Sequence, residues 1–419
     1  MLALVNFIDK IVIGLVAVPM VAELRLSAQQ FGLVAGSFFW LFSLSTVLVG
    51  FLSNRVHTRW LILAMCASWA LLQLPQAVAV NAAALLASRM LLGAAEGPAY
   101  PISIHALFKW FPDDKRNLPV AIVNQGSIAG VLLAGMLIPV VTHRWGWRTN
   151  FVLLAAVGAL WCLLWLGLGR EGSPDAGAPG TPHAAPPLPY RRIMADPSVV
   201  SVCLIGFASY WVMGLGLSWL PTYIEKGLGF SGIAAGRWFA FAIAVASPVN
   251  IGLSWWSQWL LQRGVPTRLA RAGLLCGALF AAAALFIVLL CAPLGPAGKV
   301  MLYAAAGALP TLTFSLAPAL LAEFVPQTQR GSIVAIYTAL ASLGAAVSPV
   351  VMGHFVQAHG GASAHAYEQG FACGALLLVA SALAALRWLD PARSRDVLNR
   401  PQASHGTPHD ASQQHRLPM

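Results

Sequence analysis

Apolar runs of about 20 residues recur along the whole of this 419-residue chain. An α-helix rises 1.5 Å per residue, so a run of this length crosses the roughly 30 Å hydrocarbon core of a bilayer. Charged residues make up only 9% of the chain, whereas a soluble domain carries about 25%. Repeated apolar runs with so few charges predict an all-α membrane protein with many transmembrane helices.

Twelve candidate spans follow from these runs, at residues 1–22, 29–51, 60–80, 83–107, 117–141, 149–168, 198–221, 232–260, 270–292, 298–323, 331–356 and 367–388. A segment rich in Pro, Ala and Gly divides them six from six. We therefore predict a six-helix bundle over 1–169, a flexible linker over 170–197 and a second six-helix bundle over 198–390. The polar residues 391–419 are predicted to form a disordered tail.

The distribution of Lys and Arg predicts the orientation. Seventeen fall in the tail or in connections on the side of the termini, and five fall on the other side. Because cytoplasmic loops are enriched in Lys and Arg, we expect both termini in the cytoplasm of a plasma (inner) membrane protein. The net charge of +11 is spread among short connections, which argues against a nucleic-acid surface. Span one starts at Met1 without a lead sequence, which leaves an upstream start open.

The two halves of the chain contain related loops. Residues 112–122 follow span four, and residues 326–336 follow span ten at an offset of 214, with Arg116 matching Arg330. Parallel repeats of six spans are a transporter architecture with the substrate site at their interface. Chance similarity between two short loops is the alternative, and the matching position within each half argues against it.

A more specific pattern lies in span four, which contains Arg89-Met90-Leu91-Leu92-Gly93-Ala94-Ala95-Glu96-Gly97-Pro98-Ala99-Tyr100-Pro101. With Asn6-Phe7-Ile8-Asp9-Lys10 in span one, it resembles the anion:cation symporter family of the major facilitator superfamily. That family includes hexuronate, galactonate and phthalate permeases, and its span-one motif reads Asn-Tyr-x-Asp-Arg. The resemblance implies two six-helix bundles around a central cavity, and a transporter that works as a monomer.

Some positions depart from the family pattern. The loop after span two has Asn54-Arg55 where Asp-Arg is usual. Phe42, Phe207 and Thr338 align with a hydroxyl-bearing aromatic residue, a Gln and an Asn of the sugar-acid members. These changes remove polar groups that could hold sugar hydroxyls, so the resemblance favours an aromatic or short aliphatic acid over a sugar acid.

Four charged residues sit well inside spans, namely Asp9, Lys10, Arg89 and Glu96. A charge at this depth is costly and is a functional candidate by default. Arg89 and Glu96 are seven residues apart, nearly two turns, so both point to one face about 10 Å apart along the helix axis. One cavity with two charged positions would fit this spacing.

Two alternatives to a binding site remain open for these charges. Asp9 with Arg89, or Lys10 with Glu96, could form structural ion pairs between spans one and four, and an ion pair could also act as a conformational lock. Lys10 could instead extend to the cytoplasmic surface.

Other residues complete the candidate site. Pro98 and Pro101 should bend span four beside Glu96. The loop residues Asn54, Arg55, Arg116 and Arg330 are candidates for a conformational role. Tyr210 is a weaker substrate-binding candidate, since an aromatic residue in a membrane helix is most often packing.

The sequence thus predicts a proton-coupled symporter that imports a small organic carboxylate. Arg89 would attract the carboxylate with help from Lys10, and Glu96 and Asp9 would carry the coupling protons. A sodium-coupled or uncoupled carrier and a non-transporting membrane sensor on the same fold are the alternatives. We predict no enzyme, cofactor or metal site, because the chain contains no phosphate-binding loop, no His or Cys cluster with metal-ligand spacing and no catalytic cluster.

Overall fold

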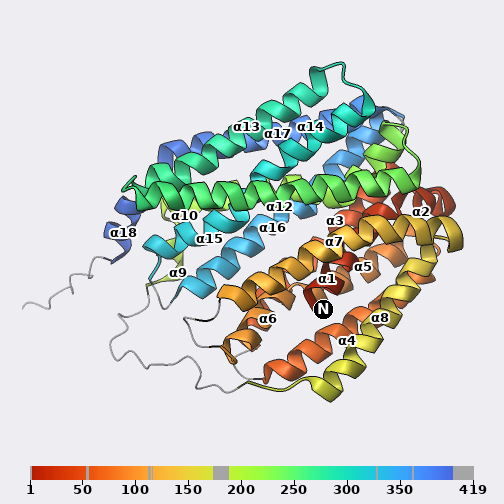
Figure 1. The fold of residues 1–419 in the computed structure, drawn as a ribbon, viewed down its shortest axis with the longest axis horizontal. Helices are drawn as coiled ribbons and strands as arrows, with labels where there is room; N and C mark the ends of the chain where they lie inside the picture. Colours follow the sequence, from red (N-terminus) through yellow and green to blue (C-terminus); the bar gives the residue numbers. More distant parts are fainter. Residues whose placement is uncertain are drawn as a thin grey trace, which may run out of the picture.

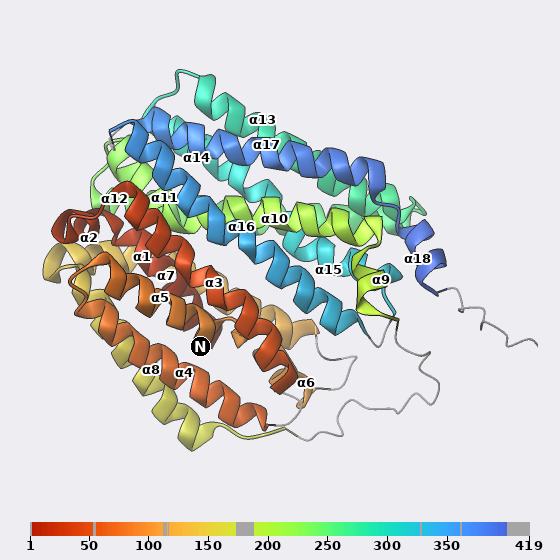
Figure 2. The ribbon, with the colours of Figure 1, turned by 180° about the vertical axis from the view of Figure 1, so that it is seen from behind.

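The computed structural model describes residues 2–52, 56–111, 115, 117–172, 188–326, 329–360 and 363–399. Regular structure within these ranges is helical (Figures 1 and 2). The first half contains α1 (Leu2–Leu15), α2 (Ala17–Leu24), α3 (Ala28–Leu52), α4 (Thr58–Ala77), α5 (Ala82–Glu96), α6 (Ala99–Phe108), α7 (Asn117–Trp145) and α8 (Trp147–Leu168).

The second half contains α10 (Pro197–Ser218), α11 (Leu220–Thr222), the π-helix η3 (Tyr223–Gly227), α12 (Gly232–Gln262), the π-helix η4 (Arg268–Gly273), α13 (Leu274–Cys291), α14 (Pro296–Ala308), the 3₁₀ turn η5 (Leu309–Thr311), α15 (Leu312–Phe324), α16 (Arg330–Ala358) and α17 (Ala364–Trp388). Two short helices, α9 (Tyr190–Met194) and α18 (Pro391–Asn399), flank this half at one end. Figure 2 shows α1–α8 grouped on one side of the molecule and α10–α17 on the other.

The helices account for the predicted spans. Ten helical segments of the described chain are long and apolar enough to cross a membrane, and α1 with α2 forms an eleventh that is bent by 53°. The remaining predicted span, 83–107, corresponds to α5 and α6, which are separately too short. With α5 and α6 counted together as one broken span, the helices correspond to the twelve predicted segments, six in each half.

The break between α5 and α6 lies beside Glu96. Gly97 still donates its N–H to the Gly93 carbonyl at 2.9 Å, but Pro98 has no N–H to continue the helix. Pro101 falls in the first turn of α6, where a missing N–H removes no helical bond. Of the two prolines predicted to bend the span, Pro98 therefore lies at the break and Pro101 lies in the first turn of the next helix.

Glycines let helices of the two halves approach closely at the end opposite the central linker. A Cβ on Gly32 would lie 2.3 Å from the Pro349 carbonyl oxygen, and one on Gly14 would lie 2.2 Å from that of Leu217. These contacts join α3 to α16 and α1 to α10. The far end of the molecule is thus closed by backbone packing between the halves.

Both ends of the predicted 170–197 linker are ordered, and residues 173–187 lie outside the described chain. Glu171 accepts hydrogen bonds from the Arg59 N–H at 2.8 Å, from Thr58 and from Lys109 Nζ at 2.5 Å. Burial alone would raise the pKa of Glu171, but the bonds from Lys109, Arg59 and Thr58 outweigh it and lower the pKa to about 2. The carboxylate satisfies the free N–H groups at the start of α4, so Glu171 is part of the folded first half.

The predicted disordered tail begins with a helix, and this part of the prediction was wrong. Ser394 donates to Asp196 at 2.8 Å and pairs with Ser198 at 2.7 Å. Leu398, one turn further, is also buried. Ser394 and Leu398 share one face of α18, which docks on the second half although the segment is polar on average. Residues 400–419 lie outside the described chain.

Candidate functional site

The four charged residues predicted from the sequence lie together inside the first bundle, between α1 and α5. Asp9, Arg89 and Glu96 are at most 1% exposed, whereas Lys10 is half-buried. Gly93 of α5 lets that helix pack closely on α3, since a Cβ on Gly93 would lie 1.8 Å from the Phe38 carbonyl oxygen. Close packing of α5 against α3 therefore holds Arg89 and Glu96 in the bundle interior.

Asn6 joins two of the charges. Its amide Nδ2 donates to Glu96 Oε2 at 2.8 Å, and its Oδ1 accepts a bond from Lys10 Nζ at 2.6 Å. The i, i+4 spacing of Asn6 and Lys10 within the span-one motif is the sequence signal for this contact. Lys10 is bound within the bundle rather than extended to the surface.

Arg89 makes a different contact from the predicted ion pair. Its Nη1 donates to the main-chain oxygen of Asp9 at 3.3 Å, and its guanidinium lies 4.7 Å from the centre of the Phe38 ring. Among the described residues, Asn6 thus lies between Lys10 and Glu96, and the Asp9 main chain receives the Arg89 bond. The charges interact electrostatically without a direct ion pair.

Several polar atoms of this cluster are buried without a hydrogen-bond partner in the described chain. They are Asp9 Oδ1, Glu96 Oε1 and Arg89 Nε. Leaving such atoms unpaired costs about 1–3 kcal/mol each, so the cluster is not optimised for stability. Each carboxyl group retains a free oxygen that can take up a proton.

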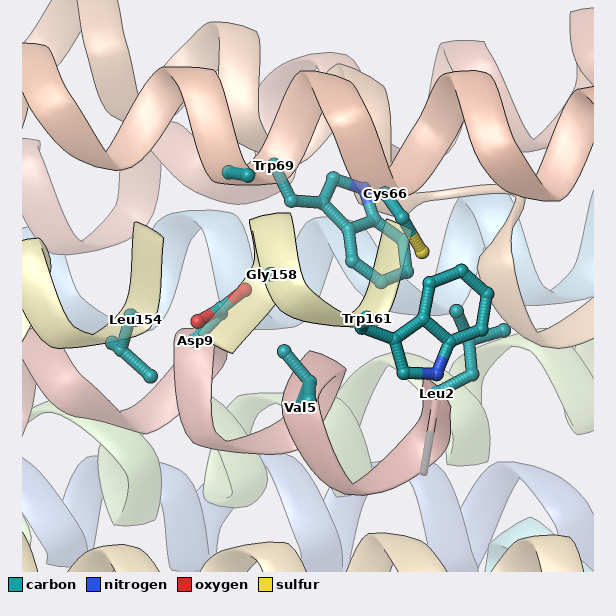
Figure 3. A pocket seen from close by; sticks show the side chains of 9 residues that line it. Leu2, Val5, Asp9, Cys66, Trp69, Leu154, Gly158 and Trp161 are labelled. Carbon is teal, nitrogen blue, oxygen red and sulfur yellow. The ribbon is translucent and has the colours of Figure 1, made fainter. Parts of the chain in front are cut away.

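The Asp9 side chain points into a small cavity between α1, α4 and α8 (Figure 3). The cavity is lined by Leu2, Val5, Asp9, Cys66, Trp69, Ala70, Leu154, Gly158 and Trp161. The centre of a water molecule has about 10 Å³ available there, which is room for about one water. Asp9 thus faces the interior of the first bundle and not the interface between the halves.

Lys10 is the only one of the four charged residues that is partly exposed. Its Nζ lies 4.7 Å from the centre of the Phe7 ring and 5.3 Å from that of Phe42. Phe42 packs against the same apolar cluster as Met213 and Tyr210 of α10. Aromatic faces attract a cation, so these rings hold the ammonium group where the halves meet.

A larger cavity lies in the second half, lined by Ser209, Val212, Met213, Gly216, Leu217, Ala242, Ile243, Ala246, Tyr303, Ala304, Gly307, Pro310, Thr311 and Phe314. The centre of a water molecule has about 80 Å³ available there. The lining is mostly apolar, and Phe314 meets Tyr210 edge-on with ring centres 5.1 Å apart. This cavity could accommodate on the order of six water-sized groups.

The packing of α1 on α10 relates Lys10 to this cavity. Both helices run away from the linker end, and Gly14 contacts the Leu217 carbonyl. Lys10 precedes Gly14 by four residues and Met213 precedes Leu217 by four residues, which is about one helical turn in each case. Lys10 therefore lies at the same depth as Met213, which lines the cavity. The charged cluster of the first half and the apolar cavity of the second therefore meet at one depth.

Two of the remaining predicted substrate residues serve local structure. Thr338 donates to the Val334 carbonyl at 2.8 Å within α16. Phe207 lies tilted on Trp211, and its main-chain oxygen would be 2.1 Å from a Cβ on Gly344. The structure does not bring these two residues to the charged cluster.

The predicted loop residues are only partly described. Arg330 Nε donates to the Val325 carbonyl at 3.2 Å and so caps the end of α15. Asn54, Arg55 and Arg116 lie outside the described residues.

Comparisons with known proteins agree with this architecture. The Major Facilitator Superfamily model matches residues 1–307 and 267–414. The hexuronate transporter of Bacillus subtilis (strain 168) is 25% identical over 92% of this chain and 92% of its own length. The D-galactonate transporter of Escherichia coli O6:H1 is 23% identical over 86% of this chain and 88% of its own length. The chloroplastic ascorbate transporter of Arabidopsis thaliana is 26% identical over 61% of this chain, and the match spans only 50% of that protein.

Solved structures share the fold. A bacterial homologue of the lysosomal transporter Spinster, in an inward-facing and occupied conformation, superposes with a TM-score of 0.78 at 19% identity, covering 94% of this chain and 95% of that one. The D-xylose–proton symporter gives 0.68 at 17% identity, covering 94% and 97%. These relatives are transporters and not enzymes, as the sequence predicted. The chain belongs to the Major Facilitator Superfamily.

Proposed function

We propose that this protein imports a small organic carboxylate together with protons across the plasma membrane, by alternating access of its two bundles. The observation that carries the proposal is the pair of buried carboxyl groups, Asp9 and Glu96, each with an unpartnered oxygen, beside a cation at the interface. Two of the relatives are named as transporters of hexuronate and of D-galactonate, which supports an organic anion as the substrate. The protein would work as a monomer.

Lys10 is the proposed first contact of the substrate carboxylate, because it is half-buried at the interface while Arg89 is enclosed. A carboxylate bound to Lys10 competes with Asn6, which now connects Lys10 to Glu96. Once the ammonium charge is shared with substrate, less of it stabilises a negative Glu96, which favours proton uptake there. Substrate binding and protonation are coupled through this exchange of partners.

The hydrocarbon part of the substrate would enter the apolar cavity of the second half. Its few polar groups include Ser209, already bonded to Thr313 at 2.7 Å, and Thr311, which bonds to the Ala308 carbonyl at 2.5 Å. Apart from the Tyr303 hydroxyl, the cavity offers the hydroxyl groups of a sugar acid few partners in place of the water they would lose. This supports an aromatic or short aliphatic acid as the preferred substrate.

Filling that cavity should change substrate choice. We expect Ala246→Phe to raise the KM for labelled benzoate by at least about tenfold, since the ring loses its space, with a smaller effect on acetate. Uptake into proteoliposomes, corrected for uptake into protein-free vesicles, gives the KM for benzoate and for acetate. Ala281→Phe, on an exposed face of α13, is the matched control. Better competition by glucuronate than by benzoate in the unaltered protein would contradict the preference for an apolar acid.

The positive-inside bias predicts that both termini and the central linker are cytoplasmic. The closed end formed by Gly14 and Gly32 would then face the outside. A reporter active only in the cytoplasm, fused after Met419, should be active. An external C-terminus would contradict the proposed topology.

A further inference from the structure

Three polar side chains of α4 lie in a row inside the first bundle. Trp69, Gln73 and Gln76 are spaced four and three residues apart, which places them on one helix face. Each is at most 2% exposed. Each also has a buried atom without a hydrogen-bond partner in the described chain, namely Trp69 Nε1, Gln73 Nε2 and Gln76 Oε1. Apolar residues at these positions would avoid that cost.

The two glutamines are oriented in series. Gln76 Nε2 donates to Gln73 Oε1 at 3.3 Å and to the Leu72 carbonyl at 3.2 Å. The Gln73 amide lies next to the Asp9 carboxyl, although neither Gln73 Nε2 nor Asp9 Oδ1 makes a well-formed hydrogen bond in the described chain. The row therefore leads from Asp9 through Gln73 to the free oxygen of Gln76.

This row ends near the surface opposite the linker. Trp69 and Asp9 line the same small cavity (Figure 3). Gln73 and Gln76 lie about 6 and 10 Å further along α4, and the helix ends at Ala77. Val78 and Val80, which follow, are exposed. Polar groups thus extend from the Asp9 cavity to one end of the bundle, where the interface between the halves is closed.

We propose that Gln73 and Gln76, with Trp69, line a water-filled route inside the first bundle that brings protons to Asp9 from the outside, separately from the substrate path. Protons would pass between water molecules, and the amides would hold those waters without breaking any of their own bonds. The titratable and charged groups around Asp9 are Lys10 on α1, Arg89 and Glu96 on α5, and the Cys66 thiol on α4.

The inference rests on the proposed proton coupling, and it separates two events that a single central cavity would combine. The substrate would meet Lys10 at the interface, whereas the proton would reach Asp9 through the bundle. Protonation of Asp9 could then occur while the far end of the interface is closed.

The test replaces both amides by apolar groups of similar size, Gln73→Leu with Gln76→Leu. Proteoliposomes containing the double variant take up labelled benzoate or glucuronate, whichever the unaltered protein accumulates faster, under an external acid pulse. We expect acid-driven uptake to fall by at least about tenfold, while exchange of the same acid at equal pH is unchanged. The Tm should not fall, because the double variant removes both partners of the bond between the amides together with two unpaired buried atoms, Gln73 Nε2 and Gln76 Oε1.

Gln258→Leu, on an exposed position of α12, is the matched control and should leave all three measurements unchanged. The single variant Gln76→Leu keeps Gln73 beside Asp9 and provides the test if the double variant does not fold. Normal acid-driven uptake in either Gln76 variant would overturn the proton route. A lower Tm with equal losses of exchange and acid-driven uptake would show a structural role instead. If the unaltered protein shows no acid-driven uptake, the proposed proton coupling itself fails.

Discussion

Glu96→Gln is expected to abolish the accumulation of an organic acid driven by an inward proton gradient, while exchange of that acid across the membrane persists. Asn6 Nδ2 donates a hydrogen bond to Glu96 Oε2 at 2.8 Å. Glutamine keeps the shape of the side chain, and its amide oxygen can accept the same bond. It cannot bind and release a proton, so uptake would no longer be linked to the gradient. Accumulation ratios with and without an acid pulse, together with counterflow at equal pH, measure the two activities.

Glu225→Gln is a suitable control for this experiment, because Glu225 lies in η3 outside the charged cluster. It should accumulate substrate as the unaltered protein does. Unimpaired accumulation by Glu96→Gln would remove Glu96 from the coupling role and leave Asp9 as the remaining buried carboxyl group of the cluster.

Lys10→Ala is expected to have the second large effect, a rise of at least about tenfold in the KM for the transported acid, since a desolvated charge pair typically contributes 2–5 kcal/mol on truncation. Lys10→Arg should recover part of the affinity, because it restores the positive charge between Phe7 and Phe42. Initial rates of uptake over a range of substrate concentrations give KM and kcat separately.

Arg89 provides the comparison for Lys10. Arg89→Ala should lower the Tm as well as weaken anion binding, because it leaves buried carboxylates without their neighbouring cation. Arg89→Lys should be milder in both respects. If Lys10→Ala bound substrate normally while Arg89→Ala folded normally and lost binding, Arg89 would be the direct contact of the carboxylate.

Much of the architecture could be predicted from the sequence because the bilayer allows few solutions. A segment in hydrocarbon must satisfy its own backbone hydrogen bonds, so apolar runs of about 20 residues predict helices. The same cost makes buried charges conspicuous, which is why Asp9, Lys10, Arg89 and Glu96 could be singled out. The seven-residue spacing of Arg89 and Glu96 predicts that they share one helix face, and in the structure both side chains contact α1.

The contacts among these charges could not be predicted, because they depend on how separate helices pack. Asn6 and Glu96 are 90 residues apart, and their contact depends on how α1, α3 and α5 pack together, which includes the close approach of α5 to α3 at Gly93. Helix packing is also the reason why the Lys10 side chain is partly exposed and the Arg89 side chain is buried. Both are cations in spans, but one side chain points to the interface and the other into the bundle.

Composition and periodicity determined by themselves that this chain forms a helical membrane protein in two halves, and the motifs in spans one and four determined its family. Only the tertiary structure placed the row of Gln73 and Gln76 beside Asp9, the apolar cavity opposite Lys10 and the docked helix α18. A glutamine in an apolar run, or a serine in a polar tail, has no partner that its own segment can reveal. Its neighbours come from other helices, and their positions follow from the packing of the whole chain.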